Sequence, residues 1–267
     1  MVEIQIEDLK ELQMQILDYV DDFCRKNSIK YTISGGTLLG AVRHRGYIPW
    51  DDDLDIQMLR SEYNRFTELW NKANYSHPFE LINIESGKNM GYPFGKIHNP
   101  KTVTYIEGLE RTGVFIDVFP VDDVEDDNDF QIRHEKIKHL YQERTRVFED
   151  MKRKNGTLNW RSRLRLLFLH IPSKSYNDIA CEINDLAKQK SEGEHRYVFE
   201  MISGLICKQP IPKEVFSSYS DIVFENRRYM AVSDYDTYLS RTFGDYMTLP
   251  PVEKRVSHHT FKSYWKD

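Results

Sequence analysis

Four acidic residues crowd into one short segment of this chain, Trp50-Asp51-Asp52-Asp53-Leu54-Asp55-Ile56. Apolar residues alternate with the last acids, so we expect a strand over residues 54–59. Side chains two apart on a strand share a face, which places Asp53 and Asp55 about 6 to 7 Å apart along the backbone, close enough to share Mg²⁺. Without a cation the cluster would repel itself. The segment therefore indicates a cation site or, as for most charge runs, a solvated acidic turn.

The residues before the acids favour the first alternative. Gly35 and Gly36 follow an expected strand over residues 31–34 and precede an expected helix over residues 37–44. Backbone N–H groups at such a helix start can approach a phosphate, and Thr37 adds a hydroxyl. Arg43 and His44 could complement phosphate oxygens. An ordinary tight turn and a solvated helix end are the alternatives for these two features.

A further acid, Asp117, interrupts an apolar run over residues 114–121 that we expect to be a buried strand. A buried carboxylate is costly unless it is paired. Asp117 is therefore explained by a bound metal ion or by a buried ion pair with an arginine.

A calcium-binding EF-hand loop is a different metal hypothesis for the acidic segment. Asp51, Asp53, Asp55 and Glu62 occupy loop positions 1, 3, 5 and 12, but position 6 is Ile56, where the sharp turn requires glycine. The alternating apolar residues also fit a strand better, so we reject the EF-hand.

After the acidic strand the pattern becomes one of charged helices, so we place a boundary near residue 125. The expected fold is α/β (α+β), with a core over residues 1–125 and a helical part over residues 126–267 that packs on it. Apolar residues at helical spacing predict helices over residues 7–26, 130–154, 158–171 and 176–190.

Composition narrows the function. Thirty-seven Lys and Arg against 42 Asp and Glu give a net charge of −5, so we expect no nucleic-acid partner. Cys24, Cys181 and Cys207 form no C-x-x-C pair, which fits a reducing compartment. The acidic start carries no signal-peptide pattern, and no apolar run is long enough to span a membrane, so we expect a cytoplasmic protein.

Residues 35–44 (GGTLLGAVRH) and 46–56 (GYIPWDDDLDI) closely resemble the signature of the LicD family, phosphocholine transferases of bacterial surface glycans that are related to fukutin and to the nucleotidyltransferase-fold superfamily. The resemblance continues in YPFGKI at 92–97, VFIDVFP at 114–120 and GDYM at 244–247, followed by Pro250-Pro251. It implies a small mixed sheet with flanking helices, in which residues 1–125 are a nucleotidyltransferase-like catalytic core and residues 126–267 are the substrate or acceptor part. It also implies that Asp53 and Asp55 form a first metal-binding pair and that Asp117 is the third carboxylate.

The activity implied by this resemblance is transfer of phosphocholine from CDP-choline to a hydroxyl of a lipid-linked or polymeric glycan, of the teichoic acid or lipopolysaccharide type. Asp53, Asp55 and Asp117 would be catalytic and would hold Mg²⁺ or Mn²⁺. Asp117 could instead take the proton of the acceptor. Two alternatives stay open: a transferase of the same fold that uses CDP-ribitol or CDP-glycerol, and an inactive binding subunit.

Substrate contacts are expected beside the motifs. Gly35, Gly36 and Thr37 would meet the phosphates, with Lys96 and Arg43 as candidates for the diphosphate and His44 and His259 as weaker ones. A choline head group is recognised by aromatic faces, so a cage is predicted from the aromatic residues next to the motifs, Tyr47, Trp50, Tyr92 and Phe94.

The expected helix over residues 158–171 combines an apolar stripe with Arg161 and Arg165. A core-facing helix with a solvated arginine face is the ordinary explanation. The functional hypothesis is a peripheral contact with the inner face of the plasma membrane, which would bring the site to a lipid-linked acceptor.

Overall fold

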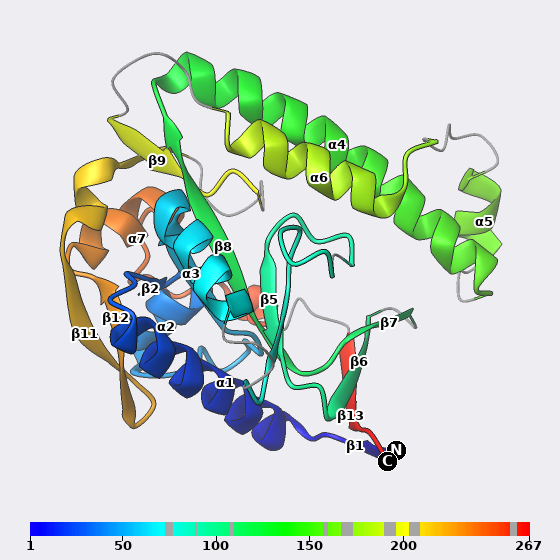
Figure 1. Ribbon diagram of the computed structural model, residues 1–267, viewed down its shortest axis with the longest axis horizontal. Coiled ribbons are helices and arrows are strands. Elements are labelled where there is room, and N and C mark those ends of the chain that lie inside the picture. Colours follow the sequence, from blue (N-terminus) through cyan, green and yellow to red (C-terminus); the bar gives the residue numbers. More distant parts are fainter. Residues whose placement is uncertain are drawn as a thin grey trace.

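The computed structural model describes residues 1–72, 77–88, 90–106, 109–156, 160–166, 173–189, 196–202, 209–256 and 261–267 (Figure 1). In these residues the α-helices are α1 (Ile6–Lys26), α2 (Gly35–His44), α3 (Arg60–Lys72), α4 (Asp127–Lys154), α5 (Trp160–Leu166), α6 (Tyr176–Ala187) and α7 (Tyr235–Phe243). Two short 3₁₀ helices are η1 (Lys213–Ser217) and η2 (Val252–Lys254). The strands are β1 (Val2–Glu3), β2 (Thr32–Ile33), β3 (Asp55–Leu59), β4 (Glu80–Ile82), β5 (Gly95–His98), β6 (Thr102–Ile106), β7 (Leu109–Thr112), β8 (Phe115–Val124), β9 (Tyr197–Phe199), β10 (Ile211–Pro212), β11 (Tyr219–Phe224), β12 (Arg227–Val232) and β13 (Phe261–Trp265).

The long strand β8 organises the main sheet. It pairs parallel with β3 on one edge, while β5 and β9 pair antiparallel with it at its two ends. β2 continues the sheet beyond β3, and β4 continues it beyond β5. The mixed strand directions confirm the α/β class, and β8 links the acidic segment to the region of α4.

Helix α1 covers one side of this sheet because one face of it is apolar. Its buried residues recur every three or four positions, as in Leu9, Leu12, Ile16 and Val20. Acids in its first turn and basic residues in its last turn favour the helix macrodipole. Ile16 and Val20 pack into the main core cluster with residues of α2, β3 and β8, whereas Leu9 and Leu12 pack with Val114 in a smaller one.

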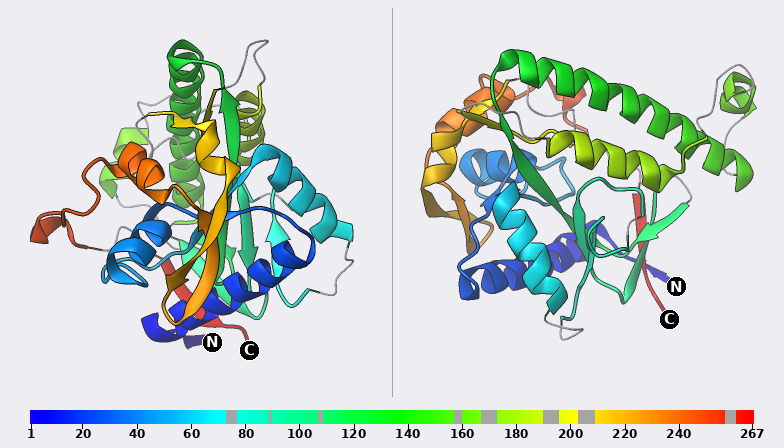
Figure 2. Two further views of the ribbon diagram at one scale, coloured as in Figure 1. Left: turned by 90° about the vertical axis from the view of Figure 1, so that its left-hand side faces the viewer. Right: turned by 45° about the horizontal axis from the view of Figure 1, so that its top comes forward.

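Helices α4 and α6 lie side by side along another side of the molecule (Figures 1 and 2). Their N-termini are capped by Asp126 and Ser175, whose side chains accept hydrogen bonds from the first turns. Arg60 binds Asp122 of β8 through two 2.7 Å hydrogen bonds and also donates to Asn184 of α6. These contacts tie the helical layer to the sheet.

The last part of the chain returns to the N-terminal elements. β12 packs against β2, where Val232 N donates to Thr32 Oγ1 at 3.1 Å, and β13 pairs with both β6 and β1. The expected helical character of residues 126–267 therefore holds for α4 to α7. In contrast, β9 and β10 extend the main sheet, β13 joins the sheet of β1 and β6, and β11 and β12 form a sheet of their own. The boundary near residue 125 stays a prediction.

The expected strands and helices around the acidic segment are present. The helix after the glycines begins at Gly35 itself, and α5 covers part of the range expected for the 158–171 helix, of which residues 167–171 lie outside the described residues. Asp55 opens a strand, so the rejected EF-hand loop is absent at this position. Within the described residues, no helix combines the length and the apolar run that crossing a bilayer requires.

Candidate active site

The start of α2 lies against the acidic segment. Gly35 has a φ of 51°, a left-handed conformation that glycine adopts without steric cost. A Cβ on Gly35 would lie 3.4 Å from Oδ2 of Asp55, and one on Gly36 would lie 2.6 Å from Oδ2 of Asp51. The glycine pair thus makes room for two carboxylates beside the positive end of the helix dipole.

Three neighbouring strands bring an acid, an acid and a base into one row. Asp55 of β3 lies opposite Asp117 of the parallel strand β8, and Asp117 lies opposite Lys96 of β5. Paired residues on adjacent strands point to the same face of a sheet. The row therefore places two carboxylates and one ammonium group side by side, and Lys96 forms an ion pair with Asp117.

The electrostatics of the row are unfavourable for negative charge. Burial raises the pKa of Asp55 well above its usual value, and the nearby carboxylates of Asp53, Asp117 and Asp51 raise the pKa further, while Lys96 lowers it. Asp55 is 7% exposed. A cation placed among these acids would stabilise their charged forms.

Some hydrogen-bonding groups in the first turn of α2 are already paired within the protein. Gly35 N donates to the hydroxyl of Tyr238 at 3.3 Å, and Thr37 Oγ1 accepts from Asp55 N at 2.9 Å. Within the described part of the chain, the N–H groups of Gly36 and Thr37 have no hydrogen-bond partner, and neither has the buried hydroxyl of Ser34. Of the donors predicted for phosphate, the Gly35 N–H is therefore occupied, and Thr37 also has a structural role.

Lys96 is buried among aromatic rings. Its Nζ lies 3.6 Å from the ring centroid of Phe115, 4.7 Å from that of Tyr92 and 5.2 Å from that of Phe94. Cation–π attraction and the ion pair with Asp117 both compensate the cost of burying the ammonium. The partner of Asp117 is thus a buried lysine, close to the buried-ion-pair alternative considered from the sequence.

A basic group lies at the opposite end of α2. Arg43 Nη1 donates to the carbonyl of Tyr246 at 2.8 Å, and Arg43 Nε donates to Nε2 of His44 at 3.0 Å. Trp50 contacts the His44 ring edge-on and lies 5.7 Å from the guanidinium of Arg255. Neither arginine forms an ion pair with a carboxylate in the described residues. The group can therefore attract an anion.

The pKa shifts in this basic group follow from its shared positive charge. Burial lowers the pKa of Arg43, and the nearby Arg255 lowers it further. Burial and Arg43 lower the pKa of His44, so its imidazole is neutral at neutral pH. His44 is thus a hydrogen-bond acceptor for Arg43 rather than a further cation.

A buried amide supports the acidic segment from α1. Gln13, which is 1% exposed, donates from Nε2 to the carbonyl of Asp52 at 3.0 Å, and its Oε1 accepts from the Tyr47 hydroxyl at 3.0 Å. Tyr47 also packs against Phe224. Gln13 and Tyr47 therefore hold the backbone of the acidic segment.

The four aromatic residues predicted to form a cage do not all pack together. Tyr92 and Phe94 contact each other and surround Lys96, whereas Tyr47 packs on Phe224 and Trp50 on His44. Phe115, which the sequence analysis did not select, completes the ring cluster around Lys96. His259 lies outside the described residues.

The acids fit a hard divalent cation by their chemistry, because carboxylate oxygens are its preferred ligands. Asp55 and Asp117 share a row, and Asp53 is close enough to raise the pKa of Asp55. As the described side chains stand, no three of them from His, Cys, Asp and Glu converge into a coordination shell. Binding through all three acids would require Asp117 to share or leave its ion pair with Lys96.

Several residues of the site were not found from the sequence. Gln13 carried a usable signal, since it is a polar residue on the apolar stripe of an amphipathic helix. Ser34, Tyr238 and Arg255 carried none, because nothing in their local sequence indicates that they approach α2.

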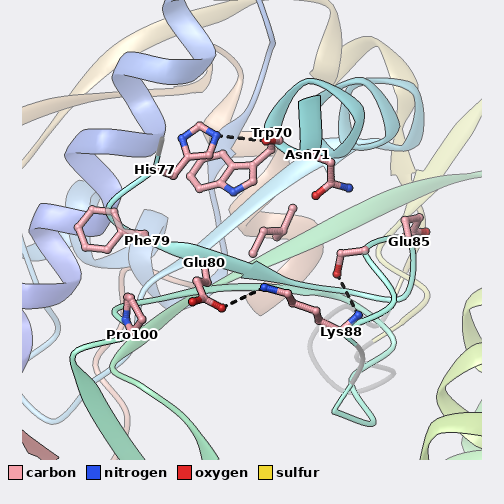
Figure 3. Close-up of a pocket in the computed structure, with 10 residues that line it drawn as sticks. Trp70, Asn71, His77, Phe79, Glu80, Glu85, Lys88 and Pro100 are labelled. Carbon is pink, nitrogen blue, oxygen red and sulfur yellow. Dashed lines mark hydrogen bonds and ion pairs between the residues drawn. The ribbon is translucent and has the colours of Figure 1, made fainter. Parts of the chain in front are cut away.

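A cavity of about 440 Å³ lies at the edge of β4 and the end of α3 (Figure 3). His77 stacks on Trp70, with ring centroids 4.1 Å apart, and Glu80 binds Lys88. None of the acids of the row lines this cavity. The candidate active site is therefore the acid row and the start of α2.

The sequence of the chain matches known proteins over nearly its whole length. Residues 28–153 match the family model described as LicD/FKTN/FKRP, nucleotidyltransferase domain. The lipopolysaccharide cholinephosphotransferase LicD of Haemophilus influenzae is 31% identical over 271 residues, which cover 96% of this chain and 97% of that protein. An uncharacterized protein of Rickettsia typhi is 44% identical over 66 residues, 24% of this chain and 21% of that protein.

Proposed function

This chain belongs to the LicD family, and on that premise we propose that it is a phosphotransferase that moves phosphocholine from CDP-choline to a hydroxyl of a cell-surface glycan precursor. The observation that carries the proposal is the acid row beside the glycine pair. Asp55 and Asp117 lie opposite each other on parallel strands, near the N–H groups of Gly36 and Thr37, which have no hydrogen-bond partner among the described residues. Such an arrangement suits a reaction that needs positioning and charge neutralisation more than covalent chemistry.

In the reaction, the acceptor oxygen forms a bond to the phosphorus that carries choline, and the bond from that phosphorus to the CMP oxygen breaks. The acceptor proton leaves to Asp117 or to water. The N–H groups of Gly36 and Thr37 bind a phosphate oxygen at the helix start. Lys96 balances negative charge at Asp117 and is in place to bind an oxygen of the diphosphate.

Asp53, Asp55 and Asp117 are the residues that would hold Mg²⁺ or Mn²⁺ in this proposal. When bound, the metal supplies charge neutralisation on the diphosphate and lowers the pKa of the acceptor hydroxyl. Asp51 lies against Gly36 and adds negative charge beside the same helix start.

The identity of the donor is the part of the proposal for which there is a specific alternative. A quaternary ammonium needs aromatic faces, and the half-buried rings of Trp50 and Phe94 are the candidates, because Tyr92 and Phe115 already face the Lys96 ammonium. A transferase on the same site that used CDP-ribitol or CDP-glycerol would need hydroxyl partners instead. An inactive binding subunit would have the same acid row but would not catalyse transfer.

A donor panel separates these possibilities. Purified protein is incubated with CDP-choline, CDP-ethanolamine, CDP-glycerol or CDP-ribitol, together with Mg²⁺ and a lipopolysaccharide acceptor, and CMP release is measured. We expect CDP-choline to give the highest kcat/KM, chelator to abolish the reaction, and Mg²⁺ or Mn²⁺ to restore it.

Full turnover in chelator would refute the metal assignment. A higher kcat/KM for CDP-ribitol or CDP-glycerol would replace the choline assignment with the competing donor. Absence of CMP release with every donor would support the binding-subunit alternative.

A further inference from the structure

Exposed apolar side chains gather in one loop of this protein. The last residue of α7 and the segment after it, residues 243–256, are here named the apolar loop. Its exposed apolar side chains are Phe243 at 40%, Met247 at 56%, Leu249 at 43%, Val252 at 72% and Val256 at 54%. The short helix η2 within it has no buried residue, and it stands out from the body of the molecule (Figure 2, left). Apolar exposure this concentrated marks an interaction surface.

The apolar loop is nevertheless anchored to the rest of the protein. Tyr246 packs against the main core, and its hydroxyl donates to Asp236 at 2.6 Å. Arg43 holds the carbonyl of Tyr246, and Arg255 Nε donates to the carbonyl of Pro250 at 2.8 Å. Tyr246 thus anchors the first half of the loop, the Arg255–Pro250 hydrogen bond closes a turn within the second half, and Met247, Leu249 and Val252 stay exposed.

The same anchors place positive charge beside the exposed apolar side chains. Arg43 and Arg255 have no carboxylate ion pair in the described residues, and Lys254 is exposed on η2. Against these three cations the loop carries two acids, Asp245 and Glu253, so one positive charge is in excess. Apolar side chains next to unneutralised cations match the boundary between acyl chains and anionic headgroups of a lipid bilayer.

We propose that the apolar loop docks this protein on an anionic phospholipid surface, with Met247, Leu249 and Val252 entering the headgroup boundary and the exposed Lys254 meeting lipid phosphates. The role of this docking rests on the proposed function, because docking would bring the enzyme to a lipid-linked acceptor in the membrane. Arg255 contacts the ring of Trp50, and the next residue, Asp51, lies against Gly36 at the start of α2. A loop docked on the bilayer therefore holds the start of α2, and the acid row beside it, near the lipid surface.

The test compares two sets of exposed apolar residues. Sedimentation with vesicles of equal parts phosphatidylethanolamine and phosphatidylglycerol is measured without donor or acceptor. We expect the full chain to bind at low salt, and Met247→Ser combined with Leu249→Ser and Val252→Ser to lower the partition coefficient by about tenfold or more. The matched control, Trp160→Ser with Leu164→Ser, removes the exposed apolar residues of α5, which are 66% and 50% exposed, and should bind like the unchanged protein.

Turnover provides the second readout. The triple serine variant should keep kcat/KM for a water-soluble acceptor and lose it for the same acceptor presented in vesicles. Because sedimentation needs no turnover, failure of the transferase proposal would appear as absent CMP release with unchanged vesicle binding.

Three results would overturn the docking proposal. One is that the unchanged protein fails to sediment with anionic vesicles at low salt. Another is that the α5 control loses binding as much as, or more than, the triple variant, which would move the lipid contact to the helix predicted from the sequence. The third is a dimer in solution that the triple variant dissociates while vesicle binding is absent, which would make a second copy the occupant of the loop.

Discussion

The two ends of α2 carry opposite charge and are built in different ways. At its start, Asp51 and Asp55 lie against the glycine pair, and at its end Arg43 lies near Arg255. Ten residues separate these ends, a length of about 15 Å. Each end carries the charge that the helix dipole favours there.

At the acidic end Asp55 is buried and Asp51 is half-buried, and this end is held by strand register, backbone hydrogen bonds and the amide of Gln13. The basic end is half-buried, and Arg43 and Arg255 come from segments far apart in the chain. An anionic substrate is repelled by the carboxylates at the acidic end, so it can bind there only together with a bound cation. At the basic end the two arginines attract the anion directly. The first end should govern the rate of reaction and the second the affinity for substrate.

Asp55→Asn is the strongest test of this division. We expect CMP release to fall by at least about 10³-fold, since a carboxylate among the reacting charges is lost. Thermal unfolding without divalent ions should show equal or higher stability, because the variant removes a buried charge that lies close to three other acids. Asp52→Asn, the next acid in the run, should keep turnover within about threefold. Loss of folding in Asp55→Asn would contradict the assignment.

Arg43→Gln and Arg255→Gln test the basic end. Each should lower kcat/KM by about 10- to 100-fold through loss of a charge-assisted hydrogen bond, mainly as a rise in KM for the donor or the acceptor. The double variant should lose less than the product of the two, because both arginines bind one anion. Arg45→Gln, an exposed neighbour, is the control. An effect confined to kcat would place the arginines at the reaction itself.

Gln13→Leu tests the support of the acidic end. We expect a loss of about 1 to 3 kcal/mol in stability, because the Asp52 carbonyl loses its donor and the Tyr47 hydroxyl keeps only the Lys10 carbonyl as acceptor. The Mg²⁺ concentration for half-maximal turnover should rise several-fold, which a purely structural residue would not cause. Gln15→Leu on the exposed face of the same helix should leave both quantities unchanged. An unaltered metal requirement in Gln13→Leu would limit the residue to packing.

The smallest expected effect is the titration of His44. Arg43→Gln removes one of the two causes that lower the pKa of His44, so the pKa should move up towards 6.5 while burial still holds it below that value. Saturating phosphate should move it in the same direction in the unchanged protein. An NMR titration of the imidazole measures both shifts. A pKa that does not respond to Arg43→Gln would remove the arginine from the surroundings of His44.

Sequence patterns predicted the acidic end well and the basic end poorly. Periodicity and glycine placement indicated α1, α2, β3 and β8, and with them the neighbourhood of Asp55 and Asp117, because these signals are local. The family resemblance was confirmed, whereas the roles of individual site residues stay predictions. Arg255 and Tyr238 reach α2 only through tertiary packing, which produces no local pattern in the sequence. Lys96 was selected as a phosphate contact, but its ion pair with Asp117 depends on a strand pairing that the sequence did not reveal.

The pairing of β3 with β8 has a consequence for how the protein folds. Asp55 and Asp117 come from distant parts of the chain, and a parallel pair requires the whole intervening crossover to be in place. Tyr238, which binds Gly35, is later still. Synthesis from the N-terminus therefore yields the mutually repelling acids early and the elements that hold them late. A divalent ion that binds only the assembled row would stabilise the final state by mass action and thus favour completion of folding over earlier, partly assembled forms.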